Sequence, residues 1–307
     1  MVLPLIVDDS TRVAALRTGA VDFNMKVDAK YKTSLLQTSP ELVGWQQYNL
    51  ECVFISFNTQ TELFDDIIVR RALHMGMDRQ AIGDAVYMEN IPMGYPISSV
   101  FPETLYTPIE KLPPELKELF EYNPEKARQL LTEAGYPDGF STSVLTGGGS
   151  LALDMLSMIK AYWVDIGVEL ELDVREGAAV SAAMRAGDYE LLIGATAINP
   201  LLHEFGHYTT RDSHLNWAFV DDPWFESQII EGTRMFPGPD KDAFTKGLAL
   251  YWIGQCWYAN FPAPVYYVYH WPWVKGYYGE TEGGDFETGN IFARMWLDQD
   301  LKEDMGY

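Results

Sequence analysis

The segment FDDIIVRRALHMGMDRQAIGDAVY, residues 64–87, predicts a capped amphipathic helix that is followed by a shorter one. Asp65 and Asp66 come just before the apolar run, where a carboxylate accepts hydrogen bonds from the free N–H groups of a helix start. Apolar residues then recur at helical spacing along one side. Arg70 and Arg71 follow one turn later, and we interpret them as surface partners of these carboxylates. Asp78 predicts the cap of the second helix.

A second segment, residues 122–140, also predicts its own boundaries. Asn123 is a preferred helix cap, Pro124 fits the first helical position, and Gly135 fits the left-handed position after the last turn. Strands are predicted in short segments rich in apolar residues, with alternation at 52–57 and 168–174, and helices where apolar residues recur every three to four residues. The expected strands are 52–57, 141–145, 168–174, 190–194 and 264–273, and the expected helices are 151–165, 178–186, 224–234 and 241–258. Alternation of strands and helices predicts an α/β fold.

The bulk composition limits the classes of partner. The chain has 307 residues, enough for one large core or two modest ones, and a formal net charge of −22. Nucleic acid is not expected as a partner, because phosphate binding needs clustered Lys and Arg. The sequence contains no run of about 20 apolar residues, so no membrane span is predicted. Cys52 and Cys256 leave two alternatives open, one disulfide or two separate thiols.

Several of these stretches resemble one family closely. The strand ending in Asn58-Thr59, the FDD cap, Val-Arg-Arg-Ala-Leu at 69–73 and Asp-Arg-Gln-Ala-Ile at 78–82 resemble the extracellular solute-binding proteins of peptide- and nickel-type ABC transporters. Residues 122–140, YNPEKARQLLTEAGYPDGF, match that family almost letter for letter. The resemblance implies a periplasmic-binding-protein-like fold of type II, in the peptide-binding class, with a mixed sheet flanked by helices.

The resemblance also implies a function and a location. A small-molecule solute, such as a peptide or a sugar, is held between two lobes that close about a hinge, and the closed form is presented to an ABC permease. We expect the full-length protein at the periplasmic or extracellular face of the cytoplasmic membrane. No enzymatic activity and no cofactor are expected.

The chain is expected to be a C-terminal portion of such a protein, without a signal peptide or lipid anchor. Residues 1–262 are predicted to form the C-terminal α/β lobe, and residues 263–307 a return segment that belongs to a missing N-terminal first lobe. Surface that faces that lobe in longer relatives would be exposed here, or covered in a dimer.

The segment His203-Glu204-Phe205-Gly206-His207 matches the HExxH pattern of zinc proteases, in which two imidazoles bind zinc and the glutamate is a general base. This makes a zinc metallohydrolase the alternative function. Catalytic zinc needs a third protein ligand. Thr210 and Ser213 stand where the extended pattern needs Gly and His, and no separate pattern supports Glu226 or Glu231. The resemblance to the solute-binding family places this segment in a loop after the strand at 190–194. We therefore treat His203 and His207 as candidate metal ligands only.

The same region carries the prediction of the ligand site. Peptide-binding members of the family have an aspartate shortly after the strand that corresponds to residues 190–194 here. This aspartate receives the α-amino group of the ligand. Ile198 falls at about that position, so a standard peptide is not the expected solute. The ligand-binding candidates are Thr196, Ile198, Asn199 and His203. Dense aromatic residues at 217 and 266–273 are interpreted as packing rather than as a ligand platform.

Overall fold

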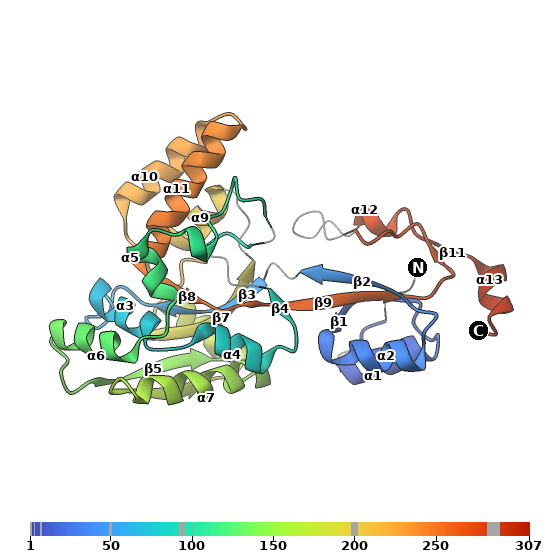
Figure 1. Cartoon of the computed structure of the whole chain (residues 1–307), viewed down its shortest axis with the longest axis horizontal. Coiled ribbons are helices and arrows are strands. Elements are labelled where there is room, and N and C mark those ends of the chain that lie inside the picture. Colours follow the sequence, from blue (N-terminus) through green and yellow to red (C-terminus); the bar gives the residue numbers. More distant parts are fainter. Residues whose placement is uncertain are drawn as a thin grey trace. The chain divides into compact units, whose positions relative to one another are not determined.

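The computed structural model describes residues 2, 4–6, 8–48, 51–91, 96–99, 101–197, 202–280 and 289–307. The chain folds into two compact units (Figure 1). The larger unit holds Leu50–Val86 and Asn90–Ala263, and the smaller unit holds Met1–Asn49, Tyr87–Glu89 and Pro264–Tyr307. Residues 1–49, which we expected in the large lobe, thus pack with the C-terminal segment that begins at Pro264.

The larger unit is built on a mixed sheet with the strand order β6-β5-β7-β3-β8. Strand β5 is parallel to β6 and to β7, whereas β3 is antiparallel to β7 and to β8. The strands are β3 (Glu51–Phe57), β5 (Phe140–Thr146), β6 (Val168–Val174), β7 (Leu191–Ala197) and β8 (Tyr258–Asn260), with the short β4 (Asn90–Ile91) outside this sheet. The mixed sheet confirms the predicted α/β class.

Helices cover both faces of this sheet. They are α3 (Ile67–Met75), α4 (Arg79–Val86), α5 (Pro114–Lys117), α6 (Pro124–Glu133), α7 (Ser150–Val164), α8 (Gly177–Ala186), α9 (Leu202–Thr209), α10 (Pro223–Arg234) and α11 (Pro239–Gln255). Single 3-10 turns lie at Ile109–Lys111 and Glu118–Phe120. With α5 they give local structure to residues 109–120.

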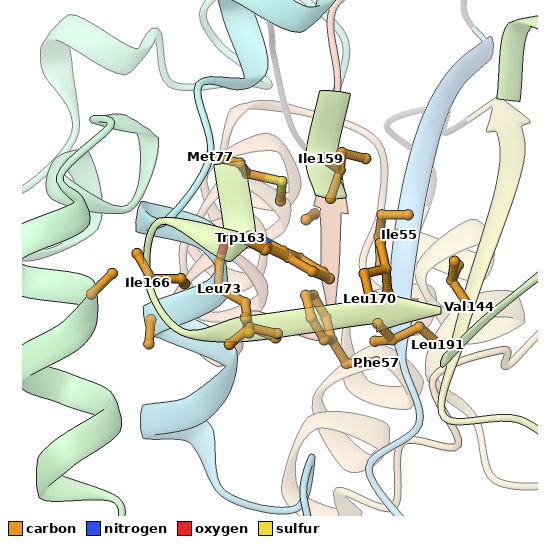
Figure 2. Packing of buried hydrophobic residues seen from close by; sticks show 14 of the residues in the cluster. Ile55, Phe57, Leu73, Met77, Val144, Ile159, Trp163, Ile166, Leu170 and Leu191 are labelled. Atoms are coloured by element: carbon orange, nitrogen blue, oxygen red, sulfur yellow. Dashed lines mark hydrogen bonds between the residues drawn. The ribbon is translucent and has the colours of Figure 1, made fainter. Parts of the chain in front are cut away.

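Strand β3 shows how the two faces are separated. Ile55 and Phe57 point into a core with α3, α4 and α7, whereas Phe54 points into a second core with α9, α10 and α11. Successive residues of a strand face opposite sides of the sheet, so one strand serves both cores. Figure 2 shows the first core, in which Trp163 of α7 lies close to Leu73 of α3. Trp163 Nε1 donates a hydrogen bond to the carbonyl oxygen of Leu73 at 3.2 Å.

The predicted helix caps are confirmed. The side chain of Asp66 accepts a hydrogen bond from Ile68 N at 2.7 Å, and that of Asp78 accepts one from Ala81 N at 2.9 Å. Asn123 caps α6 by accepting from Lys126 N at 3.0 Å, and Gly135 has a φ of 95°. The interpretation of Arg70 as a surface partner is wrong, because its side chain is buried and bonds to backbone carbonyls.

The smaller unit contains β9 (Ala263–His270) between β1 (Phe23–Asp28) and β2 (Val43–Tyr48), antiparallel to both. Its helices are α1 (Asp9–Arg17), α2 (Lys32–Thr38), α12 (Gly289–Phe292) and α13 (Gln299–Asp304), with a 3-10 turn at Ala29–Tyr31. A short antiparallel pair joins β10 (Val274–Lys275) and β11 (Trp296–Leu297). Strand β9 is buried along most of its length, so the aromatic residues predicted to lie on a strand form the core of this unit.

Two remaining expectations concern cysteines and membranes. Cys52 and Cys256 do not form a disulfide; Cys52 Sγ accepts a hydrogen bond from Asn260 Nδ2, whereas the buried Cys256 lies at the end of α11. Burial raises the pKa of the Cys256 thiol to about 11.

Within the described ranges, none of the helices has the length and apolar composition that crossing a membrane requires.

Candidate functional site

Strand β7 leads into the segment that was predicted to hold the ligand. It pairs antiparallel with β3 from Leu191 to Ala197, so the backbone of Thr196 lies opposite Cys52. Ile198 and Asn199 lie outside the described residues. His203 lies on the following helix, and its side chain is 57% exposed. Of the four candidates, the described part of the chain therefore places the backbone of Thr196 and the whole of His203.

The segment HEFGH was expected to be a loop, and this expectation is wrong: it lies within the helix α9, Leu202–Thr209. Leu202, Phe205 and Tyr208 recur at helical spacing and are buried in the second core of the larger unit. Helix α9 packs against α10, and a Cβ added to Gly232 of α10 would lie 2.4 Å from Leu202. Burial of this apolar side drives helix formation although the segment contains a glycine.

Burial of one side of α9 leaves two histidines exposed on the other. The side chains of His203 and His207 are 57% and 50% exposed, and their ring centres are 5.6 Å apart. Glu204 has a side chain that is only 10% exposed. Its Oε1 lies 3.2 Å from His203 Nε2, and its Oε2 lies 3.5 Å from His207 Nδ1.

The zinc-hydrolase alternative needs more than this cluster. A catalytic zinc takes three protein ligands and keeps one position for water or substrate. Across the residues that the structure describes, no three His, Cys, Asp or Glu side chains form a group able to hold a metal ion. Neither Glu226 nor Glu231 of α10 therefore supplies the third ligand. Nothing in the described part of the chain supports the hydrolase.

The aromatic residues near this segment serve packing. Trp217 stacks on Phe54 of β3 with ring centres 5.2 Å apart, and it also contacts Tyr208 of α9. In the smaller unit, the buried rings of Trp271 and Trp273 stack at 4.7 Å with an angle of 3° between their planes. Buried stacked rings do not offer a free face to a ligand.

One polar cluster of the smaller unit was not predicted. Lys32 Nζ donates to Glu89 Oε1 at 2.9 Å and to the hydroxyl of Tyr267 at 2.5 Å, and that hydroxyl donates to Glu89 Oε2 at 2.5 Å. These hydrogen bonds raise the pKa of the Lys32 ammonium and lower the pKa of the Glu89 carboxyl. Lys32 and Tyr267 are 235 residues apart, so no local spacing in the sequence indicates that they meet.

The fold is that of the type II periplasmic binding proteins. The structure of HbpA2 from Haemophilus parasuis superposes with a TM-score of 0.76 at 23% sequence identity and covers 96% of this chain and 57% of that one. At this identity the likeness concerns the fold alone.

The sequence places the chain more narrowly. It belongs to family 5 of the bacterial extracellular solute-binding proteins, because the model of the family's middle region matches residues 2–214. This confirms the predicted family.

Two curated relatives share about a third of their residues with this chain where they align. Heme-binding protein A of Haemophilus influenzae is 32% identical over 174 residues, which make up 55% of this chain and 30% of that protein. Glutathione-binding protein GsiB of Salmonella typhimurium (strain LT2) is 32% identical over 195 residues, or 60% of this chain and 33% of that protein. The chain thus matches about a third of the length of these relatives.

Proposed function

We propose that this chain is part of the solute-binding component of an ABC-type uptake transporter. The observation that carries the proposal is the match of residues 2–214 to the solute-binding family. The names of the two curated relatives, a heme-binding and a glutathione-binding protein, also describe binding rather than catalysis.

The proposed partners follow from this role. They are a small solute, an ABC permease that receives it, and a further lobe that completes the binding protein. The proposed location is the periplasm or the extracellular face of the cytoplasmic membrane, in keeping with the family's description as extracellular. Binding stabilises the closed form if the solute makes more favourable contacts in that form than in the open one.

We further propose that the solute is not a standard peptide. An isoleucine at position 198 has no charge to pair with the α-amino group of a peptide. Thr196, Asn199 and the exposed His203 are the proposed hydrogen-bonding residues for the solute. The binding of heme and of glutathione by named relatives makes these two compounds the first ligands to test.

The test uses the full-length protein, with melting temperature and calorimetric titration as readouts. Hemin, reduced glutathione and the dipeptide Ala-Ala are added separately. A ligand that binds only the folded state stabilises it by about 2.7 kcal/mol at a concentration of 100 times its Kd. We expect hemin or glutathione to raise the melting temperature and Ala-Ala to leave it unchanged.

Two results would contradict different parts of the proposal. If Ala-Ala binds, the inference from Ile198 is wrong but the protein still binds a solute. If no compound of a wider panel of peptides, sugars, glutathione and hemin binds, the transport role itself is wrong. The variant Ile198→Asp is a useful comparison, because a carboxylate at this position is expected to increase affinity for Ala-Ala.

A further inference from the structure

The exposed side of α9 carries two imidazoles, a kind of side chain that divalent transition metals accept as a ligand. His203 and His207 are four residues apart, which puts both side chains on one side of the helix. Two imidazoles that bind one metal through bonds of about 2.0–2.1 Å have ring centres roughly 5 Å apart. The observed separation of 5.6 Å is close to that value.

The carboxylate of Glu204 lies within 3.5 Å of one ring nitrogen of each histidine. A carboxylate accepts a hydrogen bond from an imidazole N–H, so its position favours a proton on Nε2 of His203 and on Nδ1 of His207. The lone pairs are then on Nδ1 of His203 and Nε2 of His207. Histidines that bind metals almost always donate their other ring N–H to a carboxylate, a carbonyl or water, and this contact fixes the ring and makes it more basic.

The backbone that carries the two histidines is held from the buried side. Phe205 is fully buried, and the carbonyl oxygen of Tyr208 accepts a hydrogen bond from the hydroxyl of Tyr258 at 2.8 Å. Ser213 Oγ donates to the carbonyl oxygen of His207 at 2.6 Å. A fixed backbone lowers the entropy that the ligand side chains lose when they bind.

We propose that His203 and His207 form a two-imidazole site for a borderline divalent metal, Cu²⁺, Ni²⁺ or Zn²⁺, with Glu204 as the positioning residue. Water or a small ligand fills the remaining coordination positions. Imidazole suits these metals, and at equal geometry Cu²⁺ binds more tightly than Ni²⁺ or Zn²⁺. The formal net charge of −22 adds a favourable field for a cation. This site does not depend on the proposed transport role.

The other histidines make the site easy to test. His74 and His270 are buried, so among the five histidines only His203, His207 and His214 are exposed. His214 lies beyond the end of α9 and is the matched control.

The experiment titrates Cu²⁺ into the untagged 307-residue chain after treatment with a chelator, by calorimetry and by electron paramagnetic resonance. We expect one Cu²⁺ per chain and a spectrum with nitrogen ligands. His203→Ala and His207→Ala should each weaken binding at least tenfold, and the double variant should remove it. His214→Ala should bind as the wild type does.

The role of Glu204 needs its own variant. Glu204→Gln should weaken Cu²⁺ binding by about 10- to 100-fold, the usual effect of removing a group that supports a metal ligand. This loss is to be compared among variants with unchanged melting temperature, since a change in folding would move both readouts. Glu204→Asp keeps the charge and should restore part of the affinity.

Either of two results would overturn the proposal. One is that the double histidine variant binds Cu²⁺ as tightly as the wild type, and the other is that His214→Ala removes binding. If only Glu204→Gln is without effect, the carboxylate does not position the ligands, and that part of the proposal is wrong.

Discussion

Arg70 of α3 donates two hydrogen bonds to the carbonyl oxygen of Gln255, the last residue of α11, from Nε at 3.1 Å and from Nη2 at 2.9 Å. Its Nη1 donates to the carbonyl oxygens of Phe64 at 2.7 Å and of Asp65 at 3.0 Å. The last carbonyls of a helix have no partner within the helix. The buried guanidinium therefore satisfies the end of α11 and ties it to the start of α3.

We expect Arg70→Lys to lower the free energy of unfolding by about 2–4 kcal/mol, because a lysine cannot reach three carbonyls with a forked donor and would leave buried acceptors unpaired. Urea denaturation of the two proteins measures this difference. The control is Arg71→Lys: that side chain is 29% exposed and lies 3.8 Å from Glu118, so its replacement should cost less than about 1 kcal/mol. An equal decrease in the free energy of unfolding in the two variants would show that the buried hydrogen bonds of Arg70 do not stabilise the protein more than the exposed contact of Arg71 does.

The contrast between Asp66 and Arg70 shows which features of α3 the sequence could predict. A cap acts within one turn, so the bond from Ile68 N to Asp66 follows from local spacing. The partner of Arg70 is 185 residues away, and the sequence does not show that these segments meet. The local pattern is equally consistent with an exposed ion pair, which is how we interpreted Arg70.

Because the imidazole of His74 is buried, we expect the protein to lose stability in mild acid. The ring is buried beside Phe57, and its Nε2 has no hydrogen-bond partner among the described residues. Burial, with a smaller contribution from Arg79 and Arg70, holds the pKa of this imidazole well below its ordinary value of 6.5. In the unfolded chain the imidazole takes up a proton near pH 6.5, whereas in the folded protein it remains neutral.

The unfolded state therefore binds more protons below pH 6.5, and the free energy of unfolding falls as the pH falls from that value toward the folded-state pKa. The expected slope from this group is at most about 1.4 kcal/mol per pH unit. Denaturation at several pH values between about 5 and 8 measures it. His74→Asn keeps a side-chain N–H near the position of Nδ1 but does not titrate, so its slope should be smaller. An unchanged slope would mean that other groups cause the pH dependence.

The candidate site could be predicted only in part. Strand β7 begins with a short apolar run, Leu191 to Ile193, within the strand predicted at 190–194, but α9 does not follow from the sequence of HEFGH. Its helical form depends on burial of Leu202 and Phe205 against segments more than about 15 residues further along. The cluster of Lys32, Glu89 and Tyr267 joins three distant segments, and each residue alone has an ordinary sequence context.

At Gly139 we expect the addition of a single methyl group to lower the stability of the protein strongly. Its φ is 77°, and an added Cβ would lie 1.8 Å from the carbonyl oxygen of Gly167. This carbonyl accepts the hydrogen bond from Phe140 N that starts the pairing of β5 with β6. Because backbone cannot yield as a side chain can, Gly139→Ala should cost at least about 3 kcal/mol or prevent folding.

Gly135→Ala separates backbone conformation from crowding at Gly139. Gly135 also has a positive φ, 95°, but an added Cβ would meet no atom within 4 Å. It should cost only about 1–2 kcal/mol, the strain of the left-handed conformation. Thermal unfolding of both variants gives the comparison, and a similar loss in both would show that contact with Gly167 does not matter.

Tyr267→Phe tests the polar cluster of the smaller unit. Removing the hydroxyl breaks its bonds to Lys32 and Glu89 but leaves their direct contact at 2.9 Å. The side chains of Lys32 and Glu89 are each 36% exposed, so water replaces part of what is lost, and we expect the free energy of unfolding to fall by about 0.5–1.5 kcal/mol. The same hydroxyl lowers the pKa of Glu89, so part of the effect should disappear as acid protonates this carboxyl.

The control for this prediction is Tyr278→Phe. It changes a residue that is 72% exposed and should alter neither stability nor its pH dependence. Denaturation of the three proteins at about pH 7 and about pH 3.5 measures both effects, and a loss for Tyr267→Phe no larger than that for Tyr278→Phe would show that the cluster does not stabilise the unit.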